Sequence, residues 1–131
     1  MIVVDSSALV AILRREPGAD RFLQVIAAAD RCFLSAMSLL ETSMVLAGRT
    51  GDSTAWAGLD NLIARAGMEV VAQDAEQARL ARAAFLSFGK GRHPAALNLG
   101  DCATYALARS RALPLLFKGD DFTQTDLLPA A

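Results

Sequence analysis

The N-terminal stretch Met1-Ile-Val-Val-Asp-Ser-Ser-Ala-Leu-Val-Ala-Ile-Leu13 decides how the rest of the chain is interpreted. Its apolar, β-branched start predicts a short buried strand, and Ala8–Leu13 predicts the first turns of a helix. Asp5 therefore lies where a strand ends and a helix begins. In open parallel α/β sheets, ligands bind in the crevice outside the carboxyl ends of the strands. An aspartate before a helix is also a good N-cap, so both interpretations of Asp5 stand at this point.

Apolar strand candidates alternate with helical segments along the rest of the chain. Further strands are expected at 31–34, 68–71 and 114–117, and helices at about 19–29, 38–48, 54–66, 75–87 and 101–110. This alternation favours an α/β fold with a mostly parallel central β-sheet flanked by α-helices. A length of 131 residues suits one domain over residues 1–131.

Composition narrows the classes of function. The formal net charge is −1, so any nucleic-acid binding must come from a local basic patch. Cys32 and Cys102 lack CxxC spacing and are interpreted as reduced, buried thiols. The N-terminal run has no basic leader, and no stretch approaches the ~20 apolar residues of a membrane helix. The protein is therefore expected to be cytoplasmic.

Acidic residues recur at the ends of predicted strands and the starts of predicted helices. Asp5 follows the first strand, and Asp120 and Asp121 follow the last one. Glu41 and Asp101 open helices. Each of these two also has a structural interpretation, because Glu41 stands three residues after Ser38 as in a capping box, and an acid at a helix N-terminus is favourable.

Carboxylates gathered at one sheet edge need a counter-charge. Two of them about 4 Å apart repel by about 4 kcal/mol at an effective dielectric constant of 20. Mg²⁺ prefers carboxylate oxygens, and at a phosphodiester such an ion can lower the pKa of a water and stabilise charge on the phosphate oxygens. Several acids at one edge therefore predict a divalent-metal site.

Four segments resemble the sequence blocks of PIN-domain ribonucleases: Met1–Leu9, Ser38–Thr42, Leu97–Cys102 and Leu115–Phe122. Their order and spacing are most similar to those of the VapC toxins of bacterial and archaeal toxin–antitoxin pairs. The resemblance implies a PIN-like domain that acts as a Mg²⁺-dependent endoribonuclease, with Mn²⁺ as the alternative ion. The implied substrate is structured RNA such as tRNA or rRNA, and the implied partners are a VapB-like antitoxin and a second copy in a homodimer.

The resemblance also assigns roles to residues. Asp5 and Asp101 would be the main metal ligands, and Glu41 would bind the metal directly or through water. The fourth acid usually precedes a phenylalanine, which points to Asp121 before Phe122, with Asp120 as the second candidate. Three further polar side chains are expected to support the ligands: Ser7, Asn98 and, if Asp121 is the ligand, Asp120.

Substrate contacts are less well defined. Cations near the predicted sheet edge or its loops are candidate RNA contacts, and each is equally well interpreted as a solvated surface residue: Arg14, Arg15, Arg49, Lys90, Arg92 and Lys118. Apolar excess at Leu9–Leu13 and Leu39–Leu46 suggests a groove for an antitoxin segment.

Three rival interpretations stand beside this one. A haloacid-dehalogenase-type phosphatase needs a second aspartate two residues after the first, where this chain has Ser7. A response-regulator receiver would leave Glu41 and Asp101 unexplained. A non-catalytic RNA- or protein-binding module on the same fold is the alternative, because fold does not fix function. The intact acids argue against it.

Overall fold

A computed structural model describes residues 1–51 and 53–131, with only the backbone described for residues 49 and 50. At its centre lies a four-stranded, wholly parallel sheet in the order β3-β2-β1-β4. The strands are β1 (Ile2–Val4), β2 (Cys32–Ser35), β3 (Glu69–Val71) and β4 (Leu115–Leu116). The predicted parallel sheet is confirmed, with β1 in the interior, where Val3 pairs with both Phe33 and Leu115.

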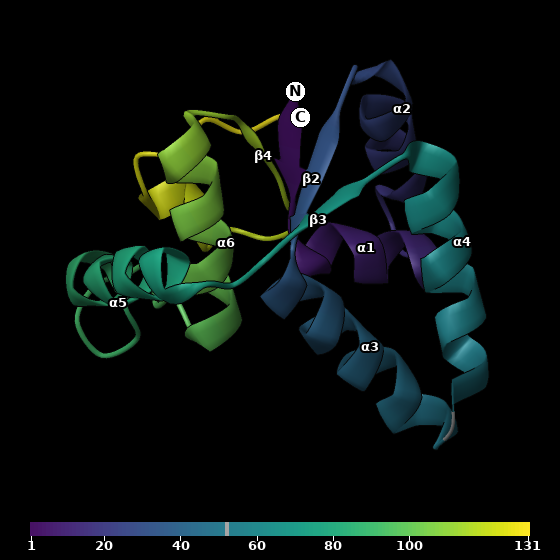
Figure 1. Ribbon diagram of the computed structural model, residues 1–131, viewed down its shortest axis with the longest axis horizontal. Helices are drawn as coiled ribbons and strands as arrows, with labels where there is room; N and C mark the ends of the chain where they lie inside the picture. The colour runs from purple at the N-terminus through teal and green to yellow at the C-terminus, as the bar shows by residue number, and fades with distance from the viewer. Residues whose placement is uncertain (52) are drawn as a thin grey trace.

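Helices cover both faces of this sheet (Figure 1). In chain order they are α1 (Ser6–Leu13), α2 (Ala19–Ala28), α3 (Ala36–Thr50), α4 (Trp56–Ala66), α5 (Ala75–Phe88) and α6 (Leu99–Arg111), with short 3-10 segments η1 (Ser53–Ala55) and η2 (Phe122–Gln124). In the view of Figure 1, α1, α2 and α4 lie on one side of the strands, and α5 and α6 lie on the other. No described helix is long and apolar enough to cross a membrane.

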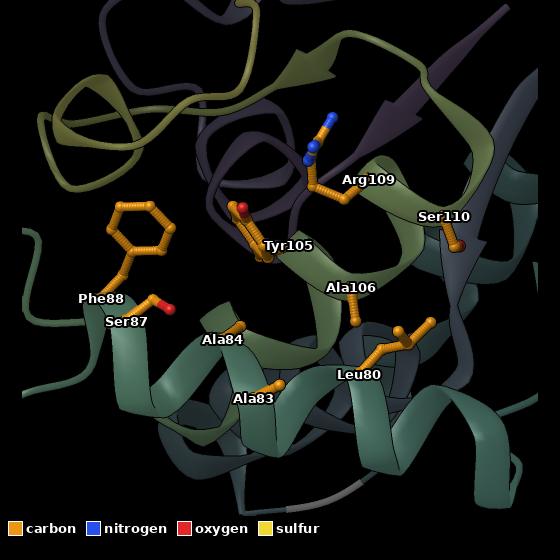
Figure 2. A pocket seen from close by; sticks show the side chains of 9 residues that line it. All are labelled: Leu80, Ala83, Ala84, Ser87, Phe88, Tyr105, Ala106, Arg109 and Ser110. Carbon is orange, nitrogen blue, oxygen red and sulfur yellow. The ribbon is translucent and has the colours of Figure 1, made fainter.

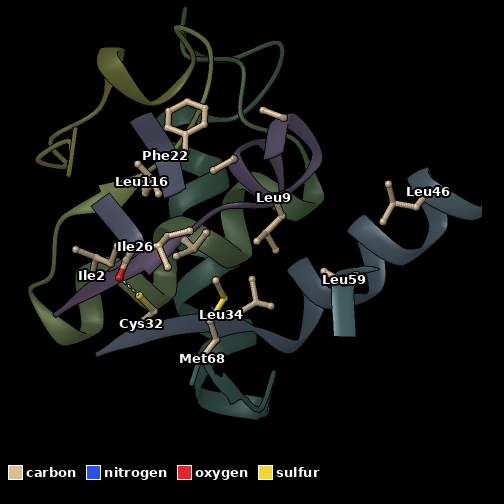
Figure 3. Packing of buried hydrophobic residues seen from close by; sticks show 13 residues of the cluster. Ile2, Leu9, Phe22, Ile26, Cys32, Leu34, Leu46, Leu59, Met68 and Leu116 are labelled. Atoms are coloured by element: carbon tan, nitrogen blue, oxygen red, sulfur yellow. Dashed lines mark hydrogen bonds between the residues drawn. The ribbon is translucent and has the colours of Figure 1, made fainter. Parts of the chain in front are cut away.

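The side chains of β1 point alternately to the two faces of the sheet, and each face has its own apolar core. Ile2 and Val4 join the core formed with α1, α2 and α4, shown in Figure 3, where Leu9 and Leu34 are fully buried. Val3 points to the opposite core, beneath α5 and α6. Successive side chains of a strand face opposite sides of a sheet, so three consecutive apolar residues anchor both layers. The carboxyl end of β1, which is followed by Asp5, is therefore held by packing on both faces of the sheet.

The predicted starts of α3 and α6 are each two residues too late. The side chain of Ser35 accepts a hydrogen bond from the Met37 amide, so Ser35 is the N-cap of α3. Ser38 therefore lies inside the helix, and the predicted capping box with Glu41 does not form. Helix α6 begins at Leu99 and is capped by Asn98, with Asp101 as the third helical residue.

Candidate active site

Three of the predicted acids line one pocket beyond the carboxyl ends of the strands. Its volume is about 350 Å³, and its lining comes from α1 with the residues on either side of it, from α3, from the start of α6 and from the chain after β4. The lining residues are Asp5, Ser6, Ser7, Val10, Glu16, Glu41, Val45, Asn98, Asp101 and Lys118.

Asp5 serves both as a helix cap and as a wall of this pocket. Its Oδ2 accepts a hydrogen bond of 3.0 Å from the Ser7 amide, which caps α1. Its Oδ1 accepts a hydrogen bond of 2.9 Å from the Thr104 hydroxyl. The residue is only 2% exposed. Burial raises the pKa of Asp5, and the hydrogen bonds from Ser7 and Thr104 act in the opposite direction. The two interpretations of Asp5 made from the sequence are therefore compatible.

Glu41 reaches the pocket from α3. The Ser6 hydroxyl donates a hydrogen bond of 2.6 Å to Glu41 Oε1. The carboxylate lies against the first turn of α6, where a Cβ built on Gly100 would approach Glu41 Oε1 to 2.6 Å. Glycine at position 100 is thus what lets the Glu41 carboxylate reach the N-terminus of α6.

Asp101 is fixed by a reciprocal capping box. Its amide donates to Asn98 Oδ1 at 2.9 Å, and its own Oδ2 accepts from the Asn98 amide at 3.1 Å. Burial raises the pKa of Asp101 to about 7, and the negative charges of Asp5, Glu41 and Asp121 add to the rise against the lowering effect of the Asn98 hydrogen bond. The charges of the other three acids therefore all act on Asp101.

The fourth acid is not part of the pocket lining. Asp121 and Asp120 are both exposed in the turn that precedes η2. The charge of Asp121 contributes to the raised pKa of Asp101. This contribution is consistent with Asp121 as the fourth acid.

The structure also shows polar residues that the sequence did not single out. Ser6 contacts Glu41, Thr104 contacts Asp5, and Glu16 lies at the pocket wall. Only Thr104 had a usable signal, because it follows Asp101 by three residues and so lies on the same face of a helix.

Of the predicted supporting residues, Ser7 accepts a hydrogen bond of 2.9 Å from the Lys118 amide, which ties the end of β4 to α1.

The donor set suits a hard divalent cation. No ion pair within the described part of the chain involves Asp5, Glu41, Asp101 or Asp121. Among the described residues, no three histidine, cysteine or acidic side chains converge closely enough to hold one ion between them. Mg²⁺ usually binds one or two carboxylates and keeps several waters, so acids spread around a pocket are compatible with it.

Among the predicted RNA contacts whose side chains the structure describes, Lys118 alone lines this pocket, and its ammonium donates to Glu16 Oε1 at 2.8 Å. Arg15 lines a different pocket with residues 16–21. Lys90 and Arg92 lie in the loop after α5, with the Arg92 guanidinium 5.7 Å from the centre of the Phe85 ring. The Arg14 Nε is buried and has no hydrogen-bond partner within the described part of the chain. The side chain of Arg49 lies outside the described residues.

A second pocket, of about 370 Å³, lies between α5 and α6. Figure 2 shows Phe88, Tyr105 and Arg109 around it. No carboxylate belongs to its lining, which consists of Leu80, Ala83, Ala84, Ser87, Phe88, Tyr105, Ala106, Arg109 and Ser110. This pocket therefore offers no ligands for a hard cation, and the acidic pocket is the candidate active site.

Comparison with known proteins shows the family of this chain. The PIN domain family matches residues 2–128. VapC ribonuclease Mb0640 of Mycobacterium bovis is 46% identical over 130 residues, covering 99% of this chain and 98% of the relative. Ribonuclease VapC of Mycolicibacterium smegmatis is 46% identical over 126 residues, covering 96% of this chain and 97% of the relative. The chain therefore belongs to the PIN-domain family, in its VapC ribonuclease branch.

Solved structures share the fold. The crystal structure of VapC20 of Mycobacterium tuberculosis superposes with a TM-score of 0.77 at 19% identity, covering 98% of this chain and 97% of that chain. A toxin–antitoxin complex from Klebsiella pneumoniae gives a TM-score of 0.72 at 16% identity, covering 100% of this chain and 98% of that chain.

Proposed function

We propose that this chain is the toxin of a type II toxin–antitoxin pair and cleaves RNA as a metal-dependent endoribonuclease. The observation that carries the proposal is the pocket lined by Asp5, Glu41 and Asp101, none of which forms an ion pair within the described part of the chain. Curated relatives at 46% identity are named ribonucleases, which favours this function over a non-catalytic binding module. The proposed substrate is structured RNA such as tRNA or rRNA.

The chain's own residues would prepare the site as follows. Asp5 and Asp101 would hold Mg²⁺, or Mn²⁺ in its place, and Glu41 would bind it directly or through water, held in position by Ser6. The bound ion would lower the pKa of a water and neutralise charge on the phosphate. Lys118, at the pocket wall, would leave Glu16 to contact a phosphate of the RNA. Below about pH 7, Asp101 would have to release a proton before it could bind the ion.

Metal removal tests the proposal. Purified, antitoxin-free protein should cleave a mixed RNA pool with Mg²⁺, lose that activity in excess EDTA, and regain it when Mg²⁺ or Mn²⁺ is restored. Gel analysis of end-labelled RNA would show discrete fragments. Cleavage that persists in EDTA and in Asp5→Asn would contradict the proposed chemistry. A folded wild-type protein that binds RNA without cutting it would favour the binding module.

Substitution of the two neighbouring acids identifies the fourth ligand. Asp121→Asn should lower the cleavage rate at least tenfold, because the site would lose the proposed fourth carboxylate that holds the ion. Asp120→Asn is the matched control and should stay within about threefold of wild type. Single-turnover rates at saturating Mg²⁺ measure both. If Asp120→Asn lowers the cleavage rate more than Asp121→Asn does, Asp120 is the fourth ligand.

An antitoxin segment would bind the apolar face of α3 beside the pocket. Leu40 is 54% and Met44 65% exposed, and Val45 also lines the acidic pocket. Leu9 and Leu46, which the sequence placed in this groove, are instead buried in the core. Met44→Glu should weaken co-purification with the antitoxin without loss of RNA cleavage. Equal recovery of the complex would place the antitoxin elsewhere.

We further propose a homodimer and a cytoplasmic location. The support for a dimer is a second set of exposed apolar side chains, on α5 and α6, namely Leu80, Phe85, Leu86 and Leu99. The support for the location is the RNA substrate together with two free, buried cysteines. Light scattering of the antitoxin-free protein measures the oligomeric state.

A further inference from the structure

Buried hydroxyl groups lie behind the acidic pocket. Ser38 and Thr42 of α3 and Thr104 of α6 each have an exposed fraction of 0%. None of them is part of the pocket lining. A buried hydroxyl is costly unless its hydrogen bonds are made, so the partners of these three side chains indicate what each one does.

Two of these hydroxyls form a directed chain that ends on Asp5. The Thr104 hydroxyl donates to Asp5 Oδ1 at 2.9 Å, which links residues 99 positions apart. The Ser38 and Thr104 hydroxyl oxygens are 2.9 Å apart. Because Thr104 has a single hydroxyl proton and uses it for Asp5, Ser38 must donate to Thr104. Thr42 takes no part, since its hydroxyl donates to the Ser38 carbonyl one turn earlier in α3.

We propose that Thr104, oriented by Ser38, is a positioning residue that holds the Asp5 carboxylate in the orientation needed to bind the divalent metal. The inference rests on the proposed function, in which Asp5 is a metal ligand. The Ser7 amide fixes Oδ2 and the Thr104 hydroxyl fixes Oδ1, so both oxygens are held while their remaining lone pairs stay available.

Loss of the Thr104 hydroxyl would lower the affinity for the metal more than it would disturb the packing of the fold. Hydrogen-bond partners of metal ligands are worth about 10- to 100-fold in metal affinity. Valine has nearly the shape of threonine, so Thr104→Val would keep the packing of α6 while leaving Asp5 Oδ1 without its donor. Thr104→Ser would retain the donor.

The test is a Mn²⁺ titration of the full chain without RNA, read by the electron paramagnetic resonance signal of free Mn²⁺. Thr104→Val should raise the Kd for Mn²⁺ by about 10- to 100-fold, and Thr104→Ser should stay within about threefold of wild type. Thr42→Val is the matched control, because it removes an equally buried hydroxyl that does not contact Asp5. Its Kd should also stay within about threefold of wild type.

Circular dichroism melts establish that each variant is folded. If Thr104→Val does not fold, Ser38→Ala replaces it and should still raise the Kd by about threefold or more. An unchanged Kd in the folded variant, or an equal loss in Thr42→Val, would overturn the positioning role. Failure of the wild-type chain to bind Mn²⁺ would overturn the proposed metal dependence and this inference with it, so the two failures are distinguishable.

Discussion

Asp101→Asn is expected to abolish RNA cleavage and, at the same time, to stabilise the metal-free protein at pH 8. Cleavage should fall more than ~100-fold, because even partners of metal ligands contribute 10- to 100-fold. Stability should rise because the folded protein raises the pKa of Asp101 from an ordinary 3.8 to about 7. A raised carboxyl pKa means that the native state holds a proton more tightly than the unfolded chain does, so stability is lost as the pH rises between these values.

The expected gain in stability of Asp101→Asn is modest but measurable. Each pKa unit corresponds to about 1.4 kcal/mol, which must be discounted here because Asp101 is only partly buried. After this discount, a gain of roughly 1 kcal/mol in the free energy of unfolding would raise the Tm by about 4 °C in a protein of this size. Differential scanning calorimetry in EDTA measures it.

Two controls separate this charge effect from other causes. The difference in Tm between Asp101→Asn and wild type should shrink as the pH is lowered from 8 to 5, because Asp101 in the folded wild type then carries a proton. Asp60→Asn, at an exposed acid of α4, should leave the Tm unchanged. A Tm for Asp101→Asn that lies below wild type at pH 8 would show that the capping box with Asn98 outweighs the repulsion, contrary to expectation.

Gly100→Ala is expected to impair cleavage by at least tenfold while leaving the fold intact. The added Cβ would overlap the Glu41 carboxylate, 2.6 Å from its Oε1, and that carboxylate must move away. Glu41 would then lose its hydrogen bond from Ser6 and its place at the pocket. Helix propensity favours alanine over glycine by about 1 kcal/mol, so α6 itself is not weakened.

Gly48→Ala is the matched control for Gly100→Ala. Gly48 lies in α3, and a Cβ there would meet no atom within 4 Å. Single-turnover cleavage and a thermal melt of both variants give the comparison. Equal activity of the two would mean that the position of the Glu41 carboxylate does not matter for catalysis.

The sequence predicted the architecture because its apolar patterns are short and regularly spaced. Three apolar residues before Asp5 supply side chains to both cores, so the strand and its burial could be predicted from local sequence. The same reasoning placed Asp5 at the sheet edge. Glu41 was placed near it because a helix that follows a parallel strand starts at that edge. Asp101 was placed there by the same reasoning, but its helix α6 follows α5 and not a strand, so its position at the pocket is set by tertiary packing.

The cap residues could not be predicted with the same accuracy. Serine occupies positions 35 and 38, and both are good caps by composition. Ser35 takes the role because it is the last residue of β2, where it pairs with Val71 of the neighbouring strand. That pairing is set by tertiary structure, and the sequence before α3 does not encode it locally.

Contacts between elements that are far apart in the sequence could not be predicted, for a related reason. The Thr104 hydroxyl reaches Asp5 only because α6 packs against β1 and α3. Likewise, Lys118 and Lys90 are both lysines in loops, and only the fold places Lys118 at the acidic pocket.

The most direct test of the proposed metal centre is to locate the ion. Crystals of the antitoxin-free protein soaked in Mn²⁺ should show an anomalous difference peak in the acidic pocket, within about 2.3 Å of carboxylate oxygens of Asp5 and Asp101. The same soak of Asp5→Asn should show a much weaker peak or none. An occupied Mn²⁺ site elsewhere, with the acidic pocket empty, would contradict the metal chemistry proposed for this protein.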